Sequence, residues 1–178
     1  MRTREAIVDA CIGLLEEGDL RPTAPRVAER AAVSVRSVFQ HFDDLESLHA
    51  SVAERLVERV AVLVRPVDPG LPLDTRLDRF VHQRALLLEA VTPIRRAADV
   101  HGPFSVEITA RLRDGQAFLR EELVRTFSPE LGTDPDRLDC LDAALSWGTW
   151  EVLRAGLGRS QAEGERVIRR LAAAALRS

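Results

Sequence analysis

The stretch that decides the fold runs from Thr23 to Leu48 and reads TAPRVAERAAVSVRSVFQHFDDLESL. Thr23 is a favourable residue at the N-terminus of a helix, and Pro25 suits the first turn because no N–H is needed there. Ser34 is a second favourable N-cap, directly before another short helical stretch. We therefore expect two short helices, over residues 23–30 and 35–41, joined by a tight turn.

Side chains in these two helices match the requirements of a helix-turn-helix. Ala28 is small enough for the helices to cross closely, and Val27, Val33 and Val38 are apolar residues that can lock the second helix onto the first. An ordinary helical hairpin with a polar solvent face has the same pattern, so the pattern alone leaves both alternatives open. The outward side of the second helix offers hydrogen-bonding groups suited to base edges, namely Arg36, Ser37, Gln40 and His41.

The rest of the chain also shows helical periodicity, punctuated by Pro and Gly, and almost no strand signal. We predict an all-α protein of about nine helices, with an N-terminal three-helix helix-turn-helix domain (residues 1–46) and a C-terminal helical domain (residues 47–178). A proline-rich linker is expected at 65–72. The helices are expected over residues 3–17, 23–30, 35–41, 43–64, 74–91, 93–101, 105–126, 134–158 and from 160 onward.

Composition narrows the possible functions. The chain has 178 residues, of which 46% are hydrophobic and 30% charged, and a net charge of -3, so DNA binding would depend on a local patch. Cys11 and Cys140 lack metal-ligand spacing and are expected to be buried free thiols. Scattered histidines, no phosphate loop and no nucleophile signature argue against an enzyme, a metal site or a cofactor. Neither a membrane span nor a signal-peptide core is recognisable, so we expect a cytoplasmic protein.

With its flanking residues, the helix-turn-helix resembles the N-terminal region of the TetR family of bacterial transcriptional regulators. That region combines a glycine after an amphipathic helix, a threonine, an Ile/Val-Ala pair, an Ala-Gly-Val-Ser turn and an aromatic-x-His-Phe sequence. The resemblance covers about the first 50 residues and rests on Gly18, Thr23, Val27-Ala28, Ala31-Ala32-Val33-Ser34, Phe39-Gln40-His41-Phe42 and Leu48.

The sequence departs from this family pattern at three positions. Ala32 replaces the turn glycine, and if that position requires a left-handed backbone, alanine costs on the order of 1–2 kcal/mol. Phe39 replaces a tyrosine and lacks its phosphate-bonding hydroxyl. Leu45 replaces a lysine that opens the fourth helix. Together these departures predict weaker contacts to the DNA backbone more than a change of fold.

The resemblance implies that double-stranded operator DNA is the partner, with contacts to phosphates and contacts to bases. The residues implied near phosphates are Thr23, Arg26 and Phe39, with Arg2 and Arg4 beside them on a flexible arm. Ser34 caps the recognition helix, and the residues implied to face base edges are Val35, Arg36, Ser37, Gln40 and His41.

The resemblance also implies a C-terminal domain that binds a small-molecule effector and a repressor that leaves its palindromic operator when the ligand binds. A regulator controlled by a partner protein, or one without an effector, is the alternative. Arg84 interrupts an apolar stripe, which suggests a snorkelling, paired or cavity-facing charge. An ordinary place in the core or on the surface is the alternative for every effector-site candidate. These candidates are Phe80, Arg84, Leu87, His101, Phe104, Ile108, Arg111, Trp147 and Trp150.

A homodimer is implied by the same resemblance. Small residues in the last two helices allow close helix approach, which suits an interface between two copies or packing within one chain. The candidate interface residues are Ala143, Ala144, Trp147, Ile168, Leu171, Ala172 and Ala175.

Overall fold

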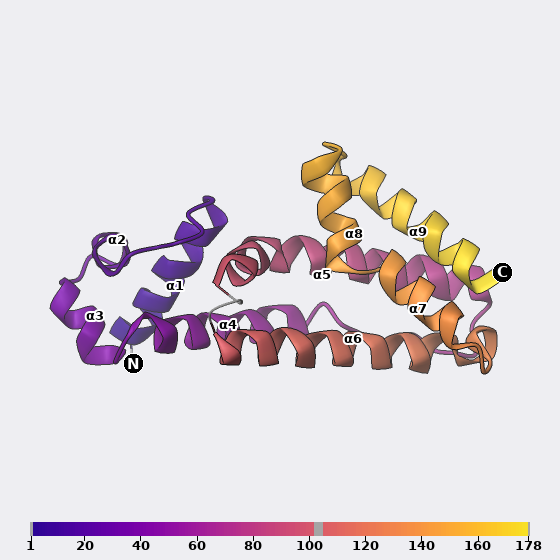
Figure 1. Ribbon diagram of the computed structural model, residues 1–178, viewed down its shortest axis with the longest axis horizontal. Coiled ribbons are helices and arrows are strands. Elements are labelled where there is room, and N and C mark those ends of the chain that lie inside the picture. Colours follow the sequence, from indigo (N-terminus) through magenta and orange to yellow (C-terminus); the bar gives the residue numbers. More distant parts are fainter. Residues whose placement is uncertain (1, 102–104, 178) are drawn as a thin grey trace. The chain divides into compact units, whose positions relative to one another are not determined.

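The computed structural model describes residues 2–101 and 105–177, and within these ranges the chain is helical with no strand (Figure 1). The prediction of an all-α fold is confirmed. The helices are α1 (Arg2–Glu16), α2 (Ala24–Arg30), α3 (Val35–His41), α4 (Leu45–Ala61), α5 (Leu73–His101), α6 (Val106–Leu131), α7 (Pro135–Ala144), α8 (Trp147–Glu151), a π-helical turn (Val152–Gly156) and α9 (Gln161–Arg177).

The chain forms two compact units. The first contains Met1–Ala61 and Pro93–Arg111, and the second contains Val62–Thr92 and Leu112–Ser178. The first unit thus extends well beyond the three helices of the helix-turn-helix region. The functional division at residue 46, between DNA binding and effector binding, stays a prediction.

The core of the first unit is built by the apolar stripe of α1. Ile7, Cys11 and Leu14 recur at helical spacing and are buried against Val27 and Val38 of the next two helices. This packing holds α2 and α3 against one supporting helix.

The two cysteines differ in their environments. Cys11 is fully buried, as the sequence led us to expect, and burial raises the pKa of its thiol to about 12. The expectation was wrong for Cys140, which is exposed. The reason is its place on α7, where Leu141 and Ala144 face the core instead.

The core of the second unit gathers around two large aromatic side chains, Trp150 of α8 and Phe127 of α6, both fully buried. Gly164 of α9 makes room for the indole, since a Cβ there would lie 3.0 Å from the Trp150 ring. Ile168, one turn further along α9, is also fully buried. The contact with Trp150 therefore determines which face of α9 points inward.

Two predicted helix boundaries were wrong. The expected break at Pro93 is absent, because α5 continues through it to His101. Leu88 before the proline and Ala97 after it are both buried, and this packing outweighs the loss of one backbone hydrogen bond. In the same way, α6 extends beyond its expected end through Pro129 to Leu131, with a kink at Phe127.

The single helix expected over 134–158 is divided instead. The hydroxyls of Ser146 and Thr149 both donate to the Ala143 carbonyl, at 2.9 and 2.6 Å, and Ser146 Oγ accepts from the Thr149 N–H at 3.2 Å. Such side-chain bonds compete with the helical backbone ladder, so α7 ends at Ala144 and Ser146 caps α8, which begins at Trp147.

No helix within residues 2–101 and 105–177 is long and apolar enough to cross a membrane. The same ranges contain no group of three or more His, Cys, Asp or Glu side chains arranged to hold a metal ion.

Candidate nucleic-acid interface

The first element that positions the site is the end of α1. Gly18 has a φ of 91°, its N–H donates to Leu15 O at 3.0 Å, and the Asp19 N–H donates to Leu14 O at 3.0 Å. This pair of bonds is a Schellman motif, which needs a left-handed residue at the position of the glycine. The motif ends α1 and turns the chain toward α2.

The turn between α2 and α3 repeats this motif without a glycine. Ala32 has a φ of 54°, its N–H donates to Glu29 O at 3.1 Å, and the Val33 N–H donates to Ala28 O at 2.9 Å. The sequence left open whether this position requires a left-handed backbone, and the structure shows that Ala32 adopts one. Ala32 pays the steric cost that a glycine would avoid.

We expect Ala32→Gly to raise the free energy of unfolding by about 0.5–1 kcal/mol, because the relief of left-handed strain exceeds the entropy that glycine adds to the unfolded chain. Ala31 provides the matched control, since its φ of -78° is right-handed. Ala31→Gly is expected to lower stability by about 0.5–1 kcal/mol. Urea denaturation of both variants measures the difference, and equal shifts of the same sign would contradict the strain at Ala32.

The helix α3 is held by a cap and one buried side chain. Ser34 Oγ accepts the Ser37 N–H at 3.1 Å, which confirms Ser34 as the N-cap. Val38 is 1% exposed and packs against the core that contains Val27 and Ala28. The opposite side of α3 is thereby turned to solvent.

That solvent side is available for recognition. Arg36, Gln40 and His41 are exposed, and within the described ranges no hydrogen bond or ion pair engages their side chains. Arg36 and Gln40 are four residues apart, so they lie on one face of the helix. Both side chains can make bidentate contacts, the arginine with guanine and the amide with adenine.

These groups are flanked by the remaining predicted base-facing residues, Val35 and Ser37, and by Phe39, which was predicted to lie near phosphates. Val35 is 39% exposed and Phe39 50% exposed, so both present apolar surface beside Arg36 and Gln40. Ser37 is half-buried, and its N–H is occupied by the Ser34 cap. Phe39 offers apolar contact but no hydroxyl.

The predicted phosphate contacts are positioned near the start of α2. Thr23 occupies the N-cap position with extended backbone, but its side chain makes no capping hydrogen bond, contrary to our expectation of a side-chain cap. Arg26 forms an ion pair with Asp19 at 2.6 Å, while its side chain stays 57% exposed. Asp19 thus holds the Arg26 guanidinium in one direction, and the sequence alone did not indicate this pairing.

Arg4 does not lie on a flexible arm, because both Arg2 and Arg4 belong to the first turn of α1. The Arg4 guanidinium lies 4.9 Å from the centroid of the Phe42 ring and donates to Ser51 Oγ at 2.6 Å. A cation over an aromatic face is attracted by the ring quadrupole, so Arg4 helps to fix the segment that follows α3.

Acidic partners offset other arginines of the first unit. Arg30 pairs with Glu17 at 2.7 Å, and Arg59 pairs with Glu16 at 3.4 Å. Arg36 has no such partner in the described part of the chain. Arg36 thus places a positive charge without an ionic partner on α3, as Arg2 and Arg21 do elsewhere in the described first unit, although the chain as a whole is acidic.

The second unit contains some of the predicted effector-site residues. Phe80, Arg84 and Leu87 of α5 line one cavity with Leu119 of α6, but its volume is about 20 Å³, which is room for a single water molecule. Arg111 and Ile108 belong to the first unit, where Arg111 lies 3.6 Å from Glu54. Phe104 and the side chain of His101 lie outside the described residues.

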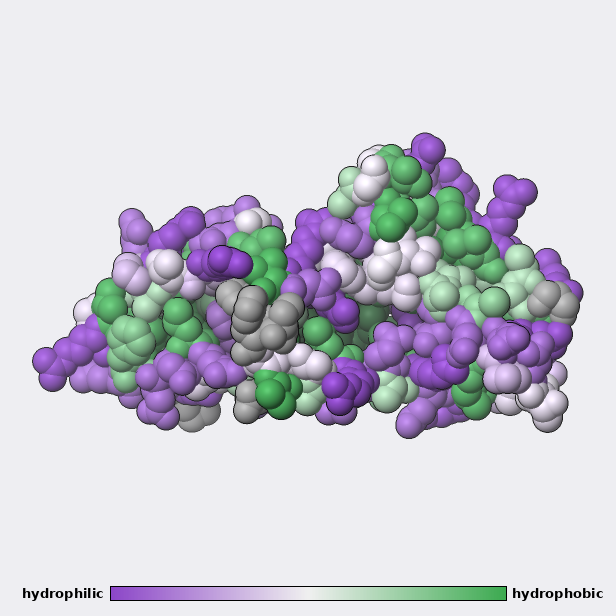
Figure 2. All heavy atoms as spheres, in the orientation of Figure 1, coloured by the Kyte–Doolittle hydropathy of each residue, from purple (hydrophilic) through white to green (hydrophobic). Residues whose placement is uncertain are grey.

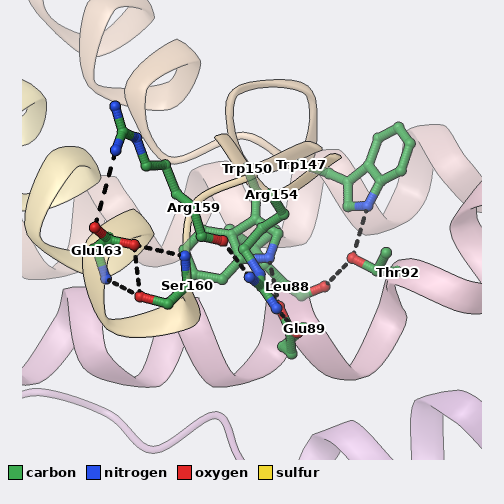
Figure 3. Close-up of polar contacts among 9 residues, drawn as sticks. All are labelled: Leu88, Glu89, Thr92, Trp147, Trp150, Arg154, Arg159, Ser160 and Glu163. Atoms are coloured by element: carbon green, nitrogen blue, oxygen red, sulfur yellow. Dashed lines mark hydrogen bonds and ion pairs between the residues drawn. The ribbon is translucent and has the colours of Figure 1, made fainter. Parts of the chain in front are cut away.

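The two tryptophans are not among the residues that line this cavity. Trp150 Nε1 donates to Glu89 at 3.0 Å, and Trp147 Nε1 donates to Thr92 Oγ1 at 3.2 Å (Figure 3). Glu89 also accepts two bonds from Arg154 of the π-helical turn, at 3.0 and 2.7 Å. Glu89 therefore ties the π-helical turn and α8 to α5, a role that the sequence did not reveal.

The predicted dimer residues divide into two groups. Ala144, Ile168 and Ala172 are buried in the core of the protomer, which leaves little of their surface for a partner, and their place in an interface stays a prediction. Trp147 and Ala175 are half-buried, whereas Ala143 and Leu171 are exposed.

A neighbouring set of apolar side chains is exposed instead. Figure 2 shows hydrophobic residues gathered over α8 and α9. Val152 and Leu157 are each 59% exposed, Val167 is 36% exposed and Leu171 is 44% exposed. We call these four residues the apolar face.

The chain has an all-α fold with an N-terminal helix-turn-helix, and solved structures share this fold. Searches of protein-family models and of curated proteins find no match. A transcriptional regulator from Rhodococcus sp. Rha1 superposes with a TM-score of 0.77 at 18% identity, covering 99% of this chain and 95% of that one. A transcriptional regulator from Streptomyces coelicolor gives a TM-score of 0.62 at 23% identity, covering 97% and 99%.

A third structure, assigned to the TetR family of transcriptional regulators and from Mesorhizobium loti, gives a TM-score of 0.67 at 17% identity, covering 99% of this chain and 96% of that one. The resemblance drawn from the N-terminal residues is thereby confirmed at the level of the fold, over nearly the whole chain.

Proposed function

We propose that this chain is a DNA-binding transcriptional regulator that reads its operator through α3. The observation that carries the proposal is the exposed, unengaged set of Arg36, Gln40 and His41 on a capped helix within the described first unit. The fold shared with transcriptional regulators supports it. It also favours a regulator over an enzyme.

Selection of bound sequences from random duplex DNA tests this function. A consensus should emerge from the wild-type protein, and its affinity should fall with salt as phosphate contacts release counterions. Because Phe39 and Leu45 replace two phosphate-binding residues of the family pattern, we expect a shallow salt slope. Recovery of no consensus, with equal binding to all duplexes, would contradict sequence-specific regulation.

We infer further that the regulator acts as a homodimer on a palindromic operator. Helix-turn-helix dimers read half-sites about 34–36 Å apart, so a selected consensus should contain an inverted repeat. The apolar face supports this inference, since clustered exposed apolar side chains mark interaction surfaces. A second copy of the same face would cover it.

Within this proposal the regulator is a repressor that a small-molecule effector releases. A ligand that favours one dimer geometry would shift the population away from the DNA-binding form. The cavity beside Arg84 supports a ligand site in the second unit. Control by a partner protein, or the absence of an effector, remains the alternative.

A further inference from the structure

The unexplained feature of the second unit is the buried guanidinium of Arg84. Its residue is 5% exposed, and its Cζ lies 5.1 Å from the centroid of the Phe80 ring. Burial lowers the pKa of Arg84 to about 10, while the charges of Asp142 and Glu122 act in the opposite direction. A buried charge is costly unless it is paired and hydrogen-bonded.

The hydrogen bonds of Arg84 satisfy it poorly. Its terminal nitrogens donate to Leu119 O at 3.2 Å and to Leu145 O at 3.5 Å, both at or beyond the long end of normal bonds. Its Nε has no partner within residues 2–101 and 105–177. A planar donor group that suits a carboxylate is therefore left largely unused.

The acids near Arg84 serve other arginines. Glu122 pairs with Arg125 at 2.5 Å, and Asp142 pairs with Arg120 at 3.1 Å. No carboxylate of the described chain lies within the 4.0 Å of an ion pair with Arg84. Arg84 thus lacks an anion within contact distance of its guanidinium.

Arg76, on the same helix, shows how a structural arginine is accommodated here. It is 4% exposed, its Nη1 and Nη2 donate to the two carboxylate oxygens of Glu130, and it also donates to Leu71 O and Thr126 O at 2.8 Å each. Arg84 is equally buried but lacks all of these strong contacts. The difference points to a ligand rather than to the fold.

The surroundings of Arg84 indicate what else the ligand carries. The cavity beside the guanidinium is lined by the apolar residues Phe80, Leu87, Leu119 and Val64, against which an apolar body can pack, and also by Arg65, Gln83 and Glu122. Val64 belongs to the non-helical segment between α4 and α5. Segments of this kind move at lower cost than helices, so this wall can open the cavity beyond its volume of about 20 Å³.

We propose that Arg84 binds the carboxylate of a small effector with an apolar body, which occupies this cavity once the Val64 wall moves. The regulatory role of that ligand rests on the proposed function, whereas its binding does not.

Calorimetric titration of the full chain with butyrate, hexanoate and octanoate, and with the corresponding uncharged amides, tests the site. Wild-type protein should bind the best carboxylate at least about ten-fold more tightly than its amide, because charge-assisted bidentate bonds are the strong ones. In Arg84→Met the two affinities should become equal within about two-fold. Arg79→Met, an exposed arginine of the same helix outside the cavity, should keep the wild-type preference.

Equal affinities of carboxylate and amide in the wild type, no binding of any carboxylate, or an unchanged preference in Arg84→Met would each overturn the proposal. If Arg84→Met does not fold, Arg84→Lys decides, since it keeps the charge but loses the planar fork and should reduce the preference. Operator titrations of the ligand-free protein test the proposed function separately. A carboxylate preference without operator binding would contradict the proposed function and leave the proposed ligand site intact. Carboxylate binding that leaves operator affinity unchanged would overturn only the regulatory role of the ligand.

Discussion

Arg36→Ala is expected to weaken binding to the selected operator about 30-fold to 10⁴-fold. One bidentate contact between a side chain and a base is worth roughly 1–3 kcal/mol of discrimination, and a dimer on a palindrome makes the contact twice. Arg36 is exposed on α3, and no partner within the described chain competes for its guanidinium. Its loss removes donors from the recognition face without removing a core contact, so the melting temperature should not change.

Arg26→Ala provides the contrast for this measurement. Arg26 is predicted to contact phosphate. Its loss should therefore weaken binding to all duplexes uniformly, and it should lower the salt slope of the affinity by about 1 per lost contact. Arg36→Ala should instead relax the preference at one base position in each half-site. An operator titration in which Arg36→Ala keeps the wild-type affinity would rule out a base contact by this residue.

Leu171→Arg is expected to convert the proposed dimer into monomers and to lower operator affinity by at least about a thousand-fold, toward non-specific binding. Leu171 is 44% exposed at the centre of the last helix, so a folded monomer can keep the arginine in water. In a dimer the same charge would be desolvated without a partner. Sedimentation velocity gives the oligomeric state, and operator titration gives the affinity.

Val124→Arg is the matched control for Leu171→Arg. Val124 is 43% exposed on α6, which is nearly the same exposure, but it lies outside the apolar face. This variant should remain dimeric and bind the operator normally. If both variants stay dimeric, the apolar face is not the interface; if both become monomeric, the effect is not specific to that face.

Much of the helix-turn-helix follows from local sequence signals. Ser34 caps α3, Gly18 ends α1, and Val38 faces the core, as the sequence predicted. Each of these depends on a few neighbouring residues, because caps and left-handed turns involve groups within one helical turn of one another. The family resemblance marked Ala32 as a position that is strained if its backbone is left-handed, and its φ of 54° is left-handed.

Contacts between residues that are far apart in the sequence could not be predicted from such local signals. Arg4 was expected on a flexible arm but lies over Phe42, and Arg26 is directed by Asp19. In each case the partner becomes a neighbour only when the helices pack. The sequence shows that the charges exist, but not which of them remain free to meet DNA.

The division of α9 into a buried and an exposed face is the clearest case of a decision made by tertiary structure. Its sequence carries two apolar stripes, one with Ile168 and Ala172 and the other with Val167 and Leu171, and helical spacing does not say which one points inward. Gly164 against the Trp150 ring decides it, since only that face permits close approach. By itself the sequence determined an all-α chain in which Ser34 caps α3, because helix periodicity and capping are local. Only tertiary packing decided which side chains form the core, which remain exposed, and that Arg84 is buried without an ionic partner in the described chain.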